Sequence, residues 1–454
     1  MAVSRLAFSH WKEVEHYLSG CNTISPNEKI HGDGEYTSQL KICDMWRDIQ
    51  GANHWNGLLN PINPFLKAEI LRYGDFAQQC YDSFDNTPSS TYYGNCKRSK
   101  SSLTKRLELL NCGRGYQVTK YIYANTSLLD SIFGEESSEG VAWIGYIAVC
   151  TDPDEIKRLG RRDIVVAWRG TQTPFEWMQN LRDILVPVMT SKATTCSNIL
   201  PISNPDARIE KGFLSCYTST DEDSVRCRMS AREIVVGEIT RLVNEYREKE
   251  EDLSITFTGH SLGAALATLS AYDIKQIMVN EYGGTSIPVT VFSFASPRVG
   301  NLSFAQHMEE IGVKVLRVIN KKDLVPKIPG IFVNEKLGWL TRLLHWFPWA
   351  YVHVGVEISL DSSSSPLLKL THNPANFHSL EVYLHTLDGF YGHNNLPFKP
   401  SGRDPALVNK HTDLLIEKLQ IPSNWWDKRN KEVVKRIDGV LVYSPSTPTP
   451  VPLR

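Results

Sequence analysis

A serine stands between two glycines in the segment Gly259-His260-Ser261-Leu262-Gly263, which follows the apolar run LSITFT and precedes the small-residue run AALATL. Such a G-x-S-x-G pattern places a serine on a sharp turn between a strand and a helix, where its hydroxyl is held outward. Glycines are needed because a side chain at either position would collide with the strand or the helix. The segment predicts that Ser261 is the nucleophile of an acyl transfer, and that His260 packs beside it.

A serine hydroxyl reacts only when an imidazole takes its proton, and a carboxylate must hold that imidazole. In proteins with this turn the acid and the histidine follow the serine along the chain. Asp323 comes after the apolar run VKVLRVIN, at the end of a strand, where catalytic groups collect in open α/β sheets. The candidate bases are among the histidines that follow it: His345, His353, His372, His378, His385 and His393. We predict Asp323 as the acid and His378 as the base, since His378 stands where a loop enters a helix. His385 is the alternative.

The negative oxygen formed during acyl transfer needs two backbone N–H donors. One comes from the residue after the nucleophile, Leu262, and the other from a loop after an earlier strand. The segment RRDIVVAWRGT supplies that loop. Thr171 can offer both its N–H and its hydroxyl, so we predict Thr171 and Leu262 as the oxyanion donors.

A sheet is expected to position these residues. Short β-rich runs alternate with helical ones from residue 116 onward. The expected β-rich runs are 116–124, 141–149, 163–170, 253–259, 288–297 and 313–320. Ser230 and Glu233 have the spacing of a helix-capping box, and helical spacing also follows Pro64. Apolar strands separated by amphipathic helices predict a mostly parallel sheet flanked by helices, the α/β-hydrolase fold.

Composition excludes several other classes of function. The net charge of −1 over 454 residues argues against a nucleic-acid partner. No run approaches the roughly 20 apolar residues of a membrane-spanning helix. Nine cysteines, with no C-x-x-C pair, indicate reduced thiols inside a cell. Neither a metal-ligand spacing nor a G-x-G-x-x-G or phosphate-binding loop is present, so we expect no metal and no cofactor.

We expect three parts along the chain. Residues 1–45 form a leader or helical extension, 46–438 a single hydrolase domain with a helical N-terminal cap, and 439–454 a tail. The leader lacks a secretory signal but has few acids near its start, as organelle leaders do. The tail is rich in proline, and we expect Ser444–Arg454 to be without regular structure.

The site residues lie in segments that resemble the class 3 lipase family, and most closely its plant phospholipase A1 branch. The resemblance runs from Trp46 to Asp438 through MWRDIQG, LRYGDFAQQCYDSFD, RLGRRDIVVAWRGT, TGHSLGAALATLSAYDI, ASPRVGN, GVKVLRVINKKDLVPKIPG and HSLEVYLHTLDG. By the family's pattern Ser261, Asp323 and His378 match the triad, and Thr171 and Leu262 match the oxyanion donors.

The resemblance implies a carboxylic ester hydrolase that acts without a cofactor on a glycerolipid at a membrane surface. The expected reaction is release of the sn-1 fatty acid from phospholipids and also from galactolipids. Members of this branch are mostly plastid proteins, and the short leader makes the cytosol the alternative. The competing functions are those of a triacylglycerol lipase or of a lipase-like signalling protein that has lost catalysis.

Two aromatic segments could meet the lipid. One contains Trp177, next to the predicted oxyanion loop, and the other contains Trp346 and Trp349, between the predicted acid and base. Aromatic rings on a basic amphipathic stretch suit a membrane interface. We therefore predict that Trp177, Trp346 and Trp349 contact substrate or interface, although an ordinary buried helix has the same composition.

Replacing Trp346 and Trp349 with alanine is expected to lower activity on vesicles or micelles far more than on a soluble short-chain ester. The chemistry stays intact while docking on the lipid weakens. Initial rates on the two substrates check this. Equal losses on both, together with a lower melting temperature, would mean that the two rings belong to the core.

Overall fold

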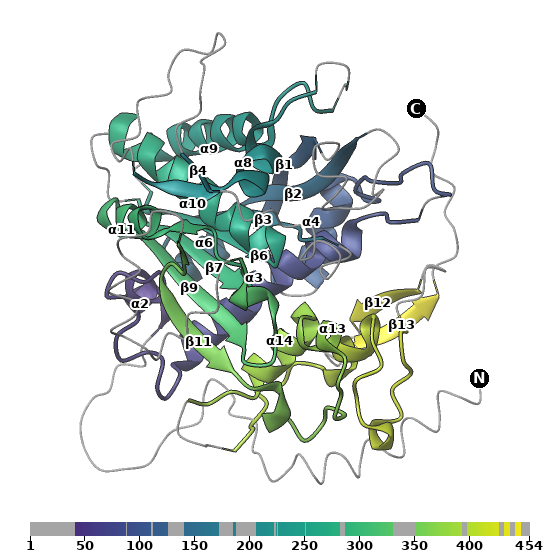
Figure 1. Ribbon diagram of the computed structural model, residues 1–454. Coiled ribbons are helices and arrows are strands. Elements are labelled where there is room, and N and C mark those ends of the chain that lie inside the picture. The colour runs from purple at the N-terminus through teal and green to yellow at the C-terminus, as the bar shows by residue number, and fades with distance from the viewer. Residues whose placement is uncertain are drawn as a thin grey trace.

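The computed structural model describes residues 41–87, 89–109, 112–125, 140–171, 185–187, 206–221, 224, 226–249, 251–281, 287–329, 350–392, 397–425, 431–435 and 441–445. Within these residues a seven-stranded sheet forms the middle layer (Figure 1). Its strands, in spatial order, are β1 (Tyr116–Asn125), β2 (Val141–Cys150), β3 (Arg162–Trp168), β6 (Leu253–His260), β7 (Val289–Phe294), β9 (Val313–Asn320) and β11 (Val356–Leu360).

The sheet is parallel from β3 to β11, and only the pairs β1–β2 and β2–β3 are antiparallel. Neighbouring parallel strands therefore end at one edge of the sheet, where loops can bring distant residues together. All six strands expected from the sequence are present, and the predicted mostly parallel sheet is confirmed.

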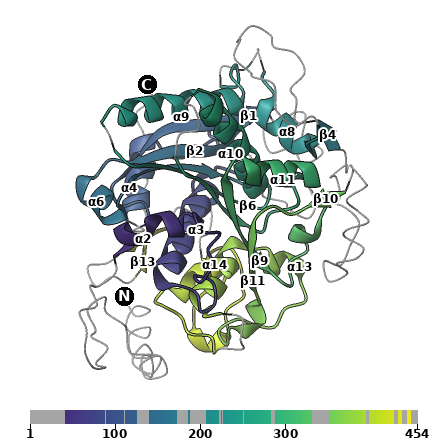
Figure 2. The ribbon, with the colours of Figure 1, turned by 90° about the vertical axis from the view of Figure 1, so that its left-hand side faces the viewer.

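Helices cover both faces of this sheet (Figure 2). One face carries α8 (Lys211–Thr218), α9 (Ala231–Arg247), α10 (Leu262–Glu281) and α11 (Leu302–Glu310). The other carries α2 (Ile42–Ile49), α3 (Pro64–Ser83), α4 (Lys100–Leu109) and α14 (Leu380–Asp388). Each face has its own buried apolar core because side chains alternate along the strands. On β6, for example, Ile255 and Phe257 pack with the α10 side, whereas Thr258 donates to the Tyr73 carbonyl of α3.

The remaining elements are short. They are α6 (Pro153–Leu159), α13 (Pro374–Phe377), and the 3₁₀ turns η2 (Val325–Lys327), η3 (Ser362–Ser364), η4 (Pro405–Lys410) and η5 (Glu417–Leu419). A four-stranded sheet has the order β10 (Tyr351–Val352), β8 (Gly300–Asn301), β5 (Arg208–Glu210) and β4 (Leu185–Pro187). Strands β12 (Lys431–Lys435) and β13 (Leu441–Pro445) form an antiparallel pair.

Local signals in the sequence locate the helix ends. Helix α9 begins with the expected capping box, in which Glu233 accepts the Ser230 N–H at 2.7 Å. Helix α3 begins at Pro64, and the side chain of Asn63 caps it. The expectation of an unstructured segment from Ser444 needs correction, since β13 continues to Pro445 and pairs with β12. The β-branched and aromatic residues of the run LVY, just before Ser444, favour a strand, and this strand includes the first two residues of the segment expected to be without regular structure.

Two further expectations can be compared with the described residues. The seven cysteines among them are all free. No helix in the described part of the chain is long and apolar enough to cross a bilayer.

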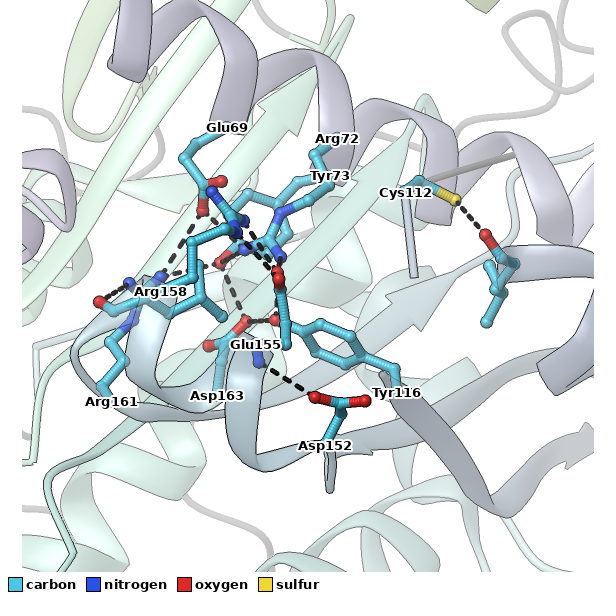
Figure 3. A network of polar contacts seen from close by, with 12 residues as sticks. Glu69, Arg72, Tyr73, Cys112, Tyr116, Asp152, Glu155, Arg158, Arg161 and Asp163 are labelled. Atoms are coloured by element: carbon cyan, nitrogen blue, oxygen red, sulfur yellow. Dashed lines mark hydrogen bonds and ion pairs between the residues drawn. The ribbon is translucent and has the colours of Figure 1, made fainter. Parts of the chain in front are cut away.

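A buried polar network joins α3 to the beginning of strands β3 and β6 (Figure 3). At its centre Asp163 accepts hydrogen bonds from the hydroxyls of Tyr73 and Tyr116, each at 2.9 Å. The hydroxyls of Ser254 and Thr256 donate to its other oxygen at 2.6 and 2.8 Å. Asp163 is fully buried, so these four donors replace its contacts with water.

The positive and negative side chains around Asp163 form ion pairs with one another. Arg72 pairs with Glu69 at 2.6 Å and with Glu155 at 3.4 Å, and Arg161 lies 3.6 Å from Glu69. Burial by itself would raise the pKa of Asp163, but Arg161 and Arg72, with the Ser254 and Thr256 hydrogen bonds, hold that pKa below its usual value. The carboxylate therefore stays ionised, and the network fixes α3 against the sheet.

Asp163→Asn is expected to lower the free energy of unfolding by about 3 kcal/mol, since removing one partner of a buried charge network leaves the others uncompensated. Urea unfolding followed by circular dichroism measures this. The matched control is Asp252→Asn, whose half-exposed carboxylate pairs with Arg47 at 2.9 Å and should contribute under about 1 kcal/mol. Similar small losses in both variants would contradict the central role of Asp163.

Candidate active site

Ser261 connects β6 to α10 through a strained turn. Its φ of 59° lies in the left-handed region, which non-glycine residues rarely adopt. The turn is held by the Ser261 N–H, which donates to the Phe294 carbonyl of β7 at 2.9 Å. A Cβ atom at Gly259 would collide with the carbonyl of Gly263, and one at Gly263 would lie 2.5 Å from the carbonyl oxygen of Trp168. Both glycines of the G-x-S-x-G motif are thus required by space, as the sequence predicted.

Asp323 and His378 are brought together from positions 55 residues apart. His378 Nδ1 lies 2.6 Å from Asp323 Oδ2, and both side chains are buried. Asp323 follows the end of β9, and its other oxygen accepts the Val325 N–H of η2 at 2.9 Å. His378 stands at the C-terminal end of α13, just before α14. The predicted acid and base therefore form the contact that orients an imidazole in a serine hydrolase.

Tyr383 is a third member of this contact that the sequence argument did not identify. Its hydroxyl donates to Asp323 Oδ2 at 2.7 Å, on the same oxygen that His378 approaches. Burial and the charge of Asp323 raise the pKa of Tyr383 well above its usual value, so the hydroxyl keeps its proton and donates. Its place five residues after His378, on the buried face of α14, is a weak signal, because many core tyrosines have such spacing.

Three polar atoms at this edge of the sheet are buried and, within the described part of the chain, have no hydrogen-bond partner. They are Ser261 Oγ, His378 Nε2 and Thr171 Oγ1. The loop that carries Thr171 packs on the turn, since a Cβ atom at the preceding Gly170 would lie 3.2 Å from the Ser261 Cβ. Leu262 is the first residue of α10, where backbone N–H groups have no partner in the helix. The five predicted site residues thus lie on elements that converge on the turn.

His385, the alternative base, does not contact Asp323. Its Nε2 lies 2.8 Å from the Ser365 hydroxyl, and the side chain is buried. Burial lowers the pKa of His385 to about 4, with opposing contributions from nearby charges. It is a neutral core histidine at ordinary pH.

The three aromatic residues predicted to contact lipid, Trp177, Trp346 and Trp349, lie outside the described residues. Their contact with substrate or interface stays a prediction. The described part of the chain contains no group of three or more histidine, cysteine or acidic side chains that could hold a metal ion.

A strained serine between strand and helix, a buried Asp–His pair and a parallel sheet define a serine hydrolase of the α/β-hydrolase class. The family described as lipase (class 3) matches residues 165–333, which contain the turn and Asp323. Phospholipase A1-Igamma2, chloroplastic, of Arabidopsis thaliana is 43% identical over 416 residues, which cover 90% of this chain and 77% of that protein. The chain belongs to the class 3 lipase family.

Two further relatives from Arabidopsis thaliana are named for a phospholipase and for a galactolipase. Phospholipase A(1) DAD1, chloroplastic, is 41% identical over 380 residues, covering 80% of each chain. Galactolipase DONGLE, chloroplastic, is 42% identical over 350 residues, covering 76% of this chain and 70% of that protein. The relatives thus include proteins named for phospholipids and for galactolipids.

The low pKa of His385 predicts how stability depends on pH. Its folded pKa of about 4 lies below the usual histidine pKa of about 6.5, so between these values the unfolded chain binds a proton that the folded chain does not. The stabilisation is complete above about pH 6.5 and is lost as the pH falls toward 4, at up to about 1.4 kcal/mol per pH unit. His385→Gln should make this slope shallower by about that amount.

Urea unfolding at a series of pH values between 4 and 7 measures the slope. The control is His372→Gln, because His372 is exposed. An unchanged slope in His385→Gln, with the fold intact, would mean that His385 already takes up its proton in the folded protein.

Proposed function

We propose that this protein is a phospholipase A1, which releases the sn-1 fatty acid from phospholipids and from galactolipids. In this proposal Ser261 is the nucleophile, His378 the general base and Asp323 the acid that holds His378. Thr171 and Leu262 donate to the oxyanion. Trp177, Trp346 and Trp349 would meet the lipid surface.

The reaction follows the usual acyl-enzyme course. Ser261 Oγ attacks the ester carbonyl while its proton passes to His378 Nε2, and the backbone donors of Thr171 and Leu262 stabilise the negative oxygen. His378 then protonates the leaving lysolipid hydroxyl, which leaves an acyl-serine. A water molecule, deprotonated by His378, releases the fatty acid and restores Ser261.

The single observation that carries this proposal is the set of unpaired buried atoms at one edge of the sheet. Ser261 Oγ, Thr171 Oγ1 and His378 Nε2 have no hydrogen-bond partner among the described residues. Buried polar atoms are normally paired, and each unpaired one costs roughly 1–3 kcal/mol. In this mechanism Ser261 Oγ attacks the ester, His378 Nε2 takes its proton, and the Thr171 hydroxyl donates to the oxyanion beside the backbone N–H, so all three atoms find their partners in the substrate complex.

The choice of substrate rests on the relatives. Proteins named phospholipase A1 and galactolipase match 76–90% of this chain at 42–43% identity. Both kinds of substrate are glycerolipids with an acyl ester at the sn-1 position, and differ in the head group. The same relatives are named chloroplastic, which supports a plastid membrane surface as the place of action, with the cytosol as the alternative.

A lipid panel tests the substrate. Purified protein is given phosphatidylcholine, a galactolipid and a triacylglycerol, each with a different acyl chain at each position, and the released acids are identified by mass spectrometry. Release from the sn-1 position of phosphatidylcholine, with the galactolipid as a further substrate, is expected. Turnover of triacylglycerol alone would make the protein a triacylglycerol lipase.

Ser261→Ala in the same assay should lower turnover by roughly 10³-fold or more while the fold is kept, since no other described group can form the acyl-enzyme. Ser363→Ala, at an exposed serine of η3, is the matched control and should keep full activity. Activity of Ser261→Ala within a few-fold of the unchanged protein would disprove the assignment of the nucleophile. A protein with no activity on any of the three lipids would support the silent, signalling alternative.

A further inference from the structure

His260 precedes the nucleophile and makes two hydrogen bonds away from it. Its Nε2 lies 2.8 Å from the main-chain carbonyl oxygen of His378, and its Nδ1 lies 2.8 Å from the hydroxyl of Tyr81 on α3. The ring is buried, and its centroid is 4.5 Å from that of His378. One side chain therefore connects the turn of Ser261 with the backbone of the predicted base.

The hydrogen on this ring can be assigned from its partners. Burial, and then the neighbouring His378, lower the pKa of His260 well below its usual value, so the ring is neutral and carries one N–H. A carbonyl oxygen can only accept, so we assign the hydrogen to Nε2, which donates to His378. Nδ1 is then an acceptor, and the Tyr81 hydroxyl donates to it. Tyr81 thus selects the tautomer that His378 requires.

We infer that His260 and Tyr81 are positioning residues for the reaction and act through the main chain of His378. This inference rests on the proposed function. Asp323 fixes the side chain of His378 at Nδ1, whereas His260 fixes its carbonyl, so ring and backbone are held from two directions. Because His260 is bonded directly to Ser261, any shift of the turn is passed to the base. The position of the His378 ring is thereby coupled to that of the Ser261 turn.

Such control matters because acyl transfer is sensitive to small displacements. A misplacement of about 1 Å can lower the rate by about 10²-fold. His378 is the C-cap residue of α13 and precedes α14, and its own N–H donates to the Ala375 carbonyl at 3.2 Å. The bond from His260 restrains the carbonyl of His378 as well.

A pair of substitutions separates this role from simple packing. In His260→Gln the side-chain amide nitrogen can reach the place of Nε2 and still donate to the His378 carbonyl. In His260→Asn the shorter amide reaches only the place of Nδ1, near Tyr81, and the bond to His378 is lost. Tyr81→Phe keeps the ring volume and removes the donor to Nδ1.

The assay uses a soluble short-chain ester, with kcat and KM measured separately and the melting temperature recorded. His260→Asn is expected to lower kcat by about 10²-fold with KM changed by less than about twofold. His260→Gln should recover kcat to within about tenfold of the unchanged protein, and Tyr81→Phe should lower kcat by a smaller factor than His260→Asn. Ser261→Ala, measured beside them, tests the proposed function itself.

Equal losses of kcat in the Asn and Gln variants would overturn the inference, since packing alone would then explain them. So would full activity in a folded His260→Asn or Tyr81→Phe. If His260→Asn does not fold, the variants His260→Gln and Tyr81→Phe test the inference. A folded His260→Gln without activity would overturn the inference, and so would Tyr81→Phe with unchanged kcat. Loss of activity in Ser261→Ala together with unchanged positioning variants would leave the proposed function standing and remove only this inference.

Discussion

The geometry of the site depends on one backbone constraint, the left-handed turn at Ser261. With a φ of 59° the chain leaves β6 and enters α10 within one residue, and this is possible only where neighbouring side chains are absent. Gly259, Gly263 and Gly170 leave that space, and the bond from the Ser261 N–H to Phe294 stabilises the strained conformation. The turn also carries His260, whose ring lies 4.5 Å from that of His378.

Helix α3 links the two ends of the sheet. It has 20 residues and is about 30 Å long at a rise of 1.5 Å per residue. In the first half of this helix, Glu69, Arg72 and Tyr73 belong to the buried network around Asp163, where β3 and β6 begin (Figure 3). Near its end, Tyr81 reaches His260, where β6 ends. One helix therefore contacts both the Asp163 network and the residue that precedes Ser261.

Buried ionisable groups in this protein differ in their charge state: some stay ionised and others are neutral. Asp163 stays charged because two arginines and four hydroxyls surround it. Burial outweighs the opposing charges of Asp388 and Glu381 around His385, and it also lowers the pKa of His260, so both rings are neutral. The contrast follows from the cost of burying a charge, which only close partners offset. Neutral His260 can donate to a carbonyl and accept from a hydroxyl at once, which a protonated ring cannot do.

The sequence by itself determined the strands and the turn that carries Ser261, because these depend on residues that are close along the chain. A serine between two glycines, placed after a strand and before a helix, favours the sharp turn. It also favoured Asp323 and His378, but by their order along the chain and by resemblance, and His385 remained open. Only the tertiary structure showed that His378 contacts Asp323 whereas His385 contacts Ser365. Only the tertiary structure revealed Tyr383 and the link from Tyr81 through His260 to His378. Those contacts join residues 60 to 179 positions apart, and sequence spacing carries no information about which of many buried polar groups will meet.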